Sequence, residues 1–99
     1  MADTKRAATL EKIKTDLRIS HSALDGDLSD TVDACLADLA ICGVASPDET
    51  DPAILAAVKL YCRAATTDDT GKADAYLERY NSLKATLMMA EGYGGAAHD

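Results

Sequence analysis

The sequence predicts an all-α fold: a small four-helix domain with short loops and a flexible, glycine-rich C-terminal tail. Apolar residues recur at the spacing of a helix face in four segments, and no segment alternates as a half-buried strand does. The apolar content of 47% depends heavily on alanine, with no Trp and no Phe. Because alanine is the best helix former and buries little surface, this composition favours helices around a narrow core. A chain of 99 residues has the size of one domain, which we place at residues 1–91, with the tail at 92–99.

The first predicted helix covers about residues 8–18. Its apolar face consists of residues three and four positions apart, namely Leu10, Ile13 and Leu17. A polar Asp-Gly-Asp turn at residues 25–27 separates this helix from the next one.

The second predicted helix covers about residues 28–42. Its apolar stripe follows the spacing i, i+4, i+7, i+8, i+11 and i+14, at Leu28, Val32, Cys35, Leu36, Leu39 and Cys42. Asp27 and Ser29 are candidate N-caps, because their side-chain oxygens can accept hydrogen bonds from the first backbone N–H groups of a helix. Gly43 is placed to end the helix in the left-handed conformation.

The third predicted helix covers about residues 52–66 and has the clearest start. Asp51 supplies a carboxylate cap, and Pro52 suits the first helical position, where a backbone N–H would have no partner. The residues expected on its buried face are Ile54, Leu55, Val58, Tyr61, Cys62 and Ala65. Turn-forming residues at 66–71 end the helix.

The fourth predicted helix covers about residues 72–90. Its apolar stripe is formed by Ala73, Tyr76, Leu77, Tyr80, Leu83 and Leu87. The segment 92–99 has no periodicity and contains three glycines, so we expect a flexible tail in the isolated subunit. Tyr93 is the residue of this tail that is able to anchor in a partner's groove.

Charge is distributed unevenly along the chain. The net charge of −7 argues against a general nucleic-acid-binding surface, which needs a basic patch. Residues 1–20 sum to +2, residues 21–58 contain no Lys or Arg and sum to −8, and residues 59–99 sum to −1. Such an asymmetry suits either intramolecular ion pairs or a head-to-tail contact between copies.

Two candidate metal sites do not fit the residues. A calcium loop starting at Asp25 would need Gly at its sixth position and an acid at its twelfth, where the chain has Asp30 and Leu36. Four residues could supply zinc ligands: Cys35, Cys42, Cys62 and His21. They include no Cys-x-x-Cys pair, and the cysteines lie in apolar stretches, so we expect reduced, buried thiols in a cytosolic protein. We expect neither a metal nor a cofactor.

No pattern indicates catalysis. The two histidines lie in segments without predicted secondary structure, and a catalytic group needs a rigid scaffold. The glycines near the C-terminus follow a helix instead of opening one, unlike a phosphate-binding loop. We therefore expect no enzyme. No apolar run approaches the ~18 residues that span a bilayer.

The order of these features resembles the head–tail connector (adaptor) proteins of long-tailed bacteriophages, some of which are labelled phage DNA-packaging proteins. The resemblance covers about residues 8–93 and is most specific in the third and fourth helices. The matching stretches are Asp51-Pro52-Ala53-Ile54, Ala57-Val58-Lys59-Leu60-Tyr61-Cys62 and Tyr76-Leu77-Glu78-Arg79-Tyr80-Asn81-Ser82-Leu83-Lys84, followed by Leu87 and Gly92-Tyr93. The resemblance implies a structural virion protein with no catalytic residues.

What this family implies is a homo-oligomeric ring under the portal protein, in the neck of a virion assembled in the host cytoplasm. The ring would extend the DNA channel, let DNA pass without sequence-specific binding, and dock the next neck or tail-completion protein. No membrane is involved.

The charged residues are then candidates for the contact between subunits. Five basic residues near the N-terminus and five acidic residues around the second helix could meet between neighbours. They are Lys5, Arg6, Lys12, Lys14 and Arg18, and Asp25, Asp27, Asp30, Asp33 and Asp38. Alternatively, the acids line the channel, where negative charge keeps DNA from sticking. The last three acids lie off the apolar stripe and are expected to face outward.

Two other functions fit the same composition. A small cytosolic interaction or regulatory module would act as a dimer and form no ring. A DNA-packaging accessory would touch DNA through an exposed and unpaired basic segment at residues 1–20.

Overall fold

The computed structural model describes residues 3–90, 92 and 93, and its described residues form four α-helices and no strand. The helices are α1 (Asp3–Leu17), α2 (Asp25–Cys42), α3 (Pro52–Thr66) and α4 (Thr70–Met89). The predicted all-α class and the number of helices are confirmed. The bounds of α3 agree with the prediction, whereas α1, α2 and α4 each begin two to five residues earlier than expected.

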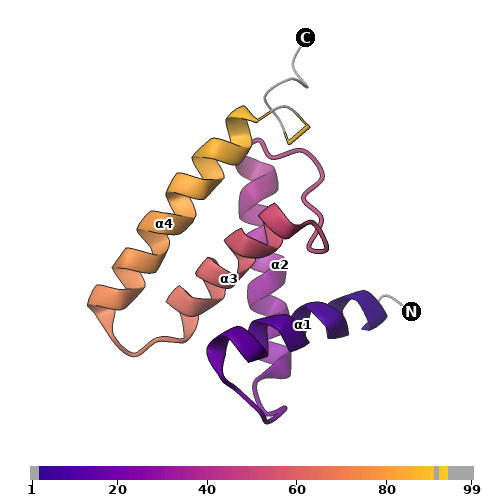
Figure 1. The fold of residues 1–99 in the computed structure, drawn as a ribbon, viewed down its shortest axis with the longest axis vertical. Coiled ribbons are helices and arrows are strands. Elements are labelled where there is room, and N and C mark those ends of the chain that lie inside the picture. Colours follow the sequence, from indigo (N-terminus) through magenta and orange to yellow (C-terminus); the bar gives the residue numbers. More distant parts are fainter. Residues whose placement is uncertain (1–2, 91, 94–99) are drawn as a thin grey trace.

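The third helix lies at the centre of the arrangement (Figure 1). It packs against each of the other three helices, most extensively against α4, which runs back alongside it. Helix α1 crosses the N-terminal part of α2, and α2 and α4 finish at the same end of the molecule. The molecule is flat, with extents of 46 × 38 × 18 Å. Such a thin body leaves room for one core layer, and α4 has a neighbour mainly on one side.

The core is made from the predicted apolar stripes. Its buried residues come from all four helices and include Ile13, Leu28, Val32, Cys35, Leu39, Ile54, Ala57, Val58, Cys62, Tyr80 and Leu87. The rings of Tyr61 and Tyr80 meet edge to face, with their centroids 5.1 Å apart. Burial raises the pKa of the Cys35 thiol to about 11 and that of the Cys62 thiol to about 12. These two thiols are therefore neutral and unreactive, as the sequence predicted.

Two predicted helix ends are confirmed. The Asp51 carboxylate accepts a hydrogen bond of 2.8 Å from the Ala53 N–H, and Pro52 follows it as the first residue of α3. Gly43 ends α2 with φ +112°, and its N–H donates to the Ala40 carbonyl.

The start of α2 was predicted wrongly. The N-cap position is Leu24, which makes no side-chain cap, and both Asp27 and Ser29 lie inside the helix. The helix gains its first turn because the Leu28 N–H donates to the Leu24 carbonyl at 2.8 Å. In place of a cap, two carboxylates in this turn, those of Asp25 and Asp27, interact favourably with the positive end of the helix dipole.

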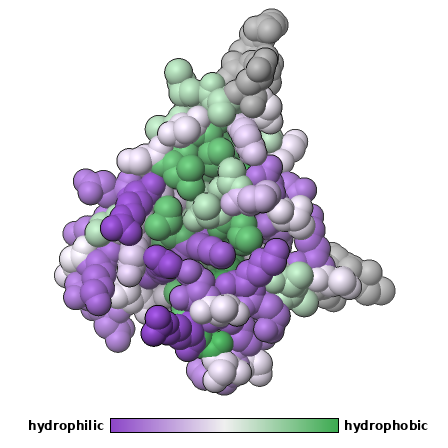
Figure 2. Space-filling view, viewed as in Figure 1, coloured by the Kyte–Doolittle hydropathy of each residue, from purple (hydrophilic) through white to green (hydrophobic). Residues whose placement is uncertain are grey.

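Some residues predicted to be buried are not. Ala65 is exposed, Leu77 is 39% exposed, and Cys42 and Leu83 are half-buried. For the two residues of α4, the cause is the flat arrangement: α4 packs mainly on α3, so Tyr80 and Leu87 are covered, whereas Leu77 and Leu83 stay partly in solvent. Figure 2 shows the result, with apolar side chains gathered between α4 and α3 and hydrophilic ones over the lower half of this face.

We place the boundary between the helical domain and the tail after residue 91, and the described part of the tail contacts the helical domain. Tyr93 packs against the core, and its backbone carbonyl accepts a hydrogen bond of 2.6 Å from the Ala45 N–H. Gly92 and Tyr93 are the described residues of the expected flexible tail, and its remainder, residues 94–99, lies outside the described residues. Within the described part of the chain, no helix has the length and apolar character needed to cross a bilayer.

Candidate functional site

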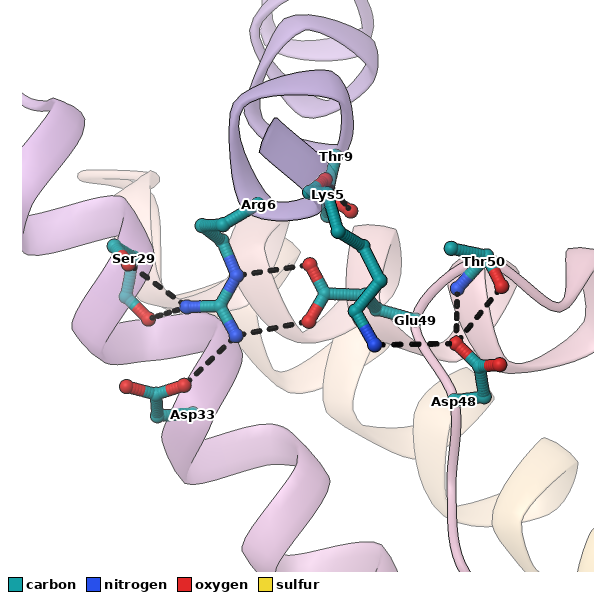
Figure 3. A network of polar contacts seen from close by, with 8 residues as sticks. All are labelled: Lys5, Arg6, Thr9, Ser29, Asp33, Asp48, Glu49 and Thr50. Carbon is teal, nitrogen blue, oxygen red and sulfur yellow. Dashed lines mark hydrogen bonds and ion pairs between the residues drawn. The ribbon is translucent and has the colours of Figure 1, made fainter. Parts of the chain in front are cut away.

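Helix α1 is attached to the rest of the molecule through an arginine clamp (Figure 3). The Nε and Nη2 atoms of Arg6 donate to the two carboxylate oxygens of Glu49, at 2.8 and 2.9 Å. Its Nη1 donates to the carbonyl and hydroxyl oxygens of Ser29, and Nη2 also donates to Asp33 at 2.8 Å. One side chain thereby joins α1 to α2 and to the loop before α3.

The clamp is partly removed from water. The side chain of Glu49 is 4% exposed and that of Arg6 is 20% exposed, so the pair is screened little by salt. The bidentate hydrogen bond from Arg6 lowers the pKa of the Glu49 carboxyl, and the same bond raises the pKa of Arg6. Nearby, Lys5 and Asp48 are both largely exposed and lie 3.9 Å apart, which makes theirs a weak pair.

Two further ion pairs hold the other end of α1. The Lys14 ammonium lies 3.0 Å from Asp25 Oδ1, in ion-pair contact but outside hydrogen-bond geometry, and only 9% of the Lys14 side chain is exposed. Arg63 of α3 donates two hydrogen bonds, of 2.8 and 2.6 Å, to the two oxygens of Asp16. Those bonds lower the pKa of the Asp16 carboxyl and raise that of Arg63.

A second polar network joins α2 to α4. The Tyr80 hydroxyl donates to Asp38 at 2.6 Å, the Lys84 ammonium donates to the same oxygen at 2.9 Å, and the Cys35 thiol donates to the Tyr80 hydroxyl at 3.8 Å. Hydrogen bonds from Tyr80 and Lys84 lower the pKa of the Asp38 carboxyl. Burial raises the pKa of Tyr80, so the phenol stays protonated and remains a donor. Asp38 was expected to face outward; its side chain is 36% exposed and also contacts Tyr80 and Lys84 of α4.

These pairs account for six of the ten charged residues that were candidates for a subunit contact. Lys5, Arg6, Lys14, Asp25, Asp33 and Asp38 form ion pairs within the chain. The remaining four, Lys12, Arg18, Asp27 and Asp30, are exposed and form no ion pair with any described residue. Two basic and two acidic candidates are thus left without an ion pair to a described residue.

An open pocket of about 350 Å³ lies where α1 ends. Its lining comes from the end of α1, the end of α3 and the start of α4, and consists of Asp16, Leu17, Arg18, Arg63, Thr66, Thr67 and Tyr76. The two arginines and one carboxylate give it a net charge of +1, unlike the chain as a whole, whose charge is −7.

The candidate zinc ligands are not brought together. Cys35 and Cys62 are buried in the core, the Cys42 thiol contacts Asp38, and His21 is exposed in the α1–α2 loop. Among residues 3–90, 92 and 93 there is no group of three or more His, Cys, Asp or Glu side chains able to hold a metal ion.

Several partners in these networks were not predicted from the sequence. Glu49 lies in a loop that reads as solvent-exposed, and Arg63 and Lys84 lie off the apolar stripes. These pairs join residues that are 42 to 47 positions apart in the sequence. Capping motifs and apolar spacing involve residues only a few positions apart, so they cannot predict such pairs.

Comparison with known proteins identifies one relationship. The family model described as "Phage connector protein" matches residues 9–94, a span that includes most of α1, the whole of α2, α3 and α4, and Tyr93. We found no match among curated proteins and none among solved structures.

Proposed function

The chain belongs to the phage connector protein family, and from this membership we propose that it is a head–tail connector subunit that forms a ring under the portal. The ring extends the DNA channel and docks the next neck or tail-completion protein. The observation that carries the proposal is the match of the family model to residues 9–94, which covers nearly the whole described fold. The family is one of structural proteins, and we propose that this member also has no catalytic activity and no cofactor.

The charges left over after internal pairing support a contact between copies. Lys12 and Arg18 lie on α1 and at its end, whereas Asp27 and Asp30 lie on α2. Opposite charges on two different elements suit a heterologous contact, in which one surface of a subunit meets another surface of its neighbour. The alternative, that the acids line the channel and repel DNA, uses Asp27 and Asp30 without assigning a role to the two basic residues.

Exposed apolar side chains mark where we place the docking of other neck components. Ile41 is 85% exposed and Met89 is 81% exposed, and they lie near the ends of α2 and α4. These ends are adjacent, because the chain beyond α2 hydrogen-bonds to Tyr93 through Ala45. Contiguous exposed apolar patches mark protein contacts, and we propose that these two side chains belong to such a patch. Tyr93 lies at this end of the molecule, and we propose that Tyr93 and the tail form a docking segment.

Under this proposal the protein is a virion component that assembles in the host cytoplasm. DNA passes through the ring without sequence-specific binding, since a chain of charge −7 repels phosphates overall.

The test uses DNA-filled particles that carry a portal but lack this protein. Purified protein added to them should bind as a symmetric ring at the portal vertex, as seen by electron cryomicroscopy, and should restore tail attachment. Light scattering of the protein alone provides a comparison, because a stable dimer that ignores the portal would favour a regulatory module and contradict the proposal.

The subunit contact has its own test, restricted to residues without internal partners. Asp27→Lys with Asp30→Lys should block ring formation, and adding Lys12→Glu with Arg18→Glu should partly restore it. Asp33 and Lys14 are left unchanged, because their substitution would break ion pairs within the subunit. If the first double variant assembles normally but alters DNA ejection, the acids line the channel.

A further inference from the structure

Helices α1 and α2 end in the same backbone motif with different residues at its key position. In α2, the Gly43 N–H and the Val44 N–H donate back to the last turn; in α1, the Arg18 N–H and the Ile19 N–H do so, with bonds of 3.2 and 2.9 Å. The key residue is left-handed in both, with φ +112° at Gly43 and φ +61° at Arg18. A side chain is disfavoured in this conformation, so glycine would suit the turn better than arginine. The turn therefore does not explain the arginine.

The side chain of Arg18 instead lines the 350 Å³ pocket at the end of α1, together with Arg63. Strained backbone at a charged residue is often retained where the side chain has a function. A cavity of this volume easily admits a side chain from another molecule, and it is open to solvent on one side.

The pocket has more hydrogen-bond donors than acceptors. Arg63 uses Nε and Nη2 on both oxygens of Asp16, which leaves Nη1 without a hydrogen bond to a described residue. The Thr67 oxygen accepts from the Asp69 N–H, so its hydroxyl hydrogen is still available. The hydroxyl of Tyr76 makes no hydrogen bond to a described residue, and neither does the guanidinium of Arg18. A ligand that satisfies these groups must accept hydrogen bonds and carry negative charge.

We propose that this pocket receives the carboxylate of Asp27 or Asp30 from a second copy of the chain, an inference that rests on the proposed ring. Both acids are exposed and have no ion-pair partner among the described residues, and the net charge of the pocket matches a single carboxylate. Planar guanidinium groups bind carboxylates through paired N–H groups, as Arg63 already does with Asp16. A DNA phosphate is the less favoured occupant, because the net charge of −7 on the chain repels the many phosphates of DNA more strongly than a single carboxylate.

The pocket itself is tested on the wild-type chain with acetate as the probe. The side-chain Nε–H signals of Arg18 and Arg63 are followed by nuclear magnetic resonance during a titration with sodium acetate, against sodium chloride at equal ionic strength. Arg79, which is exposed on α4 and forms no ion pair with a described residue, is the internal reference. We expect saturable shifts at Arg18 and Arg63 and none at Arg79. Equal responses at Arg18 and Arg79 would overturn the site.

The occupant is tested with Arg18→Gly, which removes the charge and relieves the turn. The thermal midpoint of the isolated chain should stay the same or rise, whereas ring formation on portal-bearing particles should fall by roughly tenfold or more. Arg79→Ala removes an equal charge elsewhere and should assemble as the wild type does. A lower midpoint with normal assembly would make Arg18 merely structural and would overturn the proposal.

Two further outcomes distinguish a phosphate from a carboxylate as the bound anion, and failure of the proposed ring from failure of the proposed pocket. If a short DNA duplex shifts the Arg18 signal and acetate does not, the site binds phosphate and the carboxylate proposal is wrong. If the wild-type chain forms no ring at all, the proposed function is wrong, and a second copy is then not the occupant of the pocket. In that case the acetate titration still decides whether the pocket binds an anion.

Discussion

The Tyr93 hydroxyl lies 2.9 and 3.1 Å from the two carboxylate oxygens of Asp51, to which it donates a hydrogen bond. Asp51 is also the N-cap of α3, so a single carboxylate starts the central helix and holds the last described residue of the chain. The contact with Asp51 raises the pKa of Tyr93, as expected for a phenol that donates to an anion.

This relationship predicts that Asp51→Ala has a larger effect than loss of a cap alone. Removal of the cap should lower the free energy of unfolding by about 1 kcal/mol, and loss of the Tyr93 contact should add to that. Tyr93→Phe should destabilise less, because the cap remains. Urea unfolding measures both variants, with Asp48→Ala as an exposed control; among the described residues, the Asp48 carboxylate contacts Lys5 and Thr50. Equal stabilities of Asp51→Ala and Asp48→Ala would contradict the role of Asp51.

The Arg6 clamp predicts non-additive substitutions. Arg6→Ala leaves Glu49 buried without its counter-charge and should lower the free energy of unfolding by about 2–4 kcal/mol. Glu49→Ala should cost less, because Arg6 keeps its bonds to Ser29 and Asp33. The loss of unfolding free energy in the double variant should be smaller than the sum of the losses in the two single variants. Chemical denaturation at low and at high salt measures these losses. Additive values would mean that the two side chains do not interact in solution.

Three carboxyl groups with lowered pKa values predict acid sensitivity. Asp16, Asp38 and Glu49 are stabilised as anions in the folded chain, relative to ordinary pKa values of 3.8, 3.8 and 4.5. As the pH falls through this range, the unfolded chain binds more protons than the folded one, so the free energy of unfolding decreases. Their contribution is fully present above the ordinary values and is lost on the acid side. Denaturation from about pH 6 to pH 2 should show this loss, and Glu49→Gln should flatten the slope. An unchanged slope would exclude Glu49 as a source.

The partial coverage of α4 predicts different costs for its two C-terminal leucines. Leu87 is 3% exposed and packs in the core, whereas Leu83 is half-buried at its edge. Leu87→Ala should lower the free energy of unfolding by about 2–5 kcal/mol, and Leu83→Ala should lower it by less, since less surface and a smaller cavity are involved. Thermal midpoints measured side by side compare them. A greater loss at Leu83 would mean that α4 packs in a different rotation.

The sequence by itself determined the features that act within one or two helical turns. The Asp51-Pro52 start of α3 and the Gly43 end of α2 depend on groups a few residues apart, and so does the spacing of the apolar stripes. These local interactions are also enough to predict the all-α class. The resemblance to the connector family comes from the residue stretches of the third and fourth helices.

The tertiary structure alone decided which charged residues form ion pairs within the subunit. Arg6 meets Glu49 across 43 positions, Arg63 meets Asp16 across 47, and Tyr93 meets Asp51 across 42. A charge pattern along the chain gives sign and number but not distance, and the energy of an ion pair depends on distance and on burial. That is why the sequence could propose ten contact residues, whereas the tertiary contacts of α1, α4 and the loop before α3 leave four of them, Lys12, Arg18, Asp27 and Asp30, without an ion pair to a described residue.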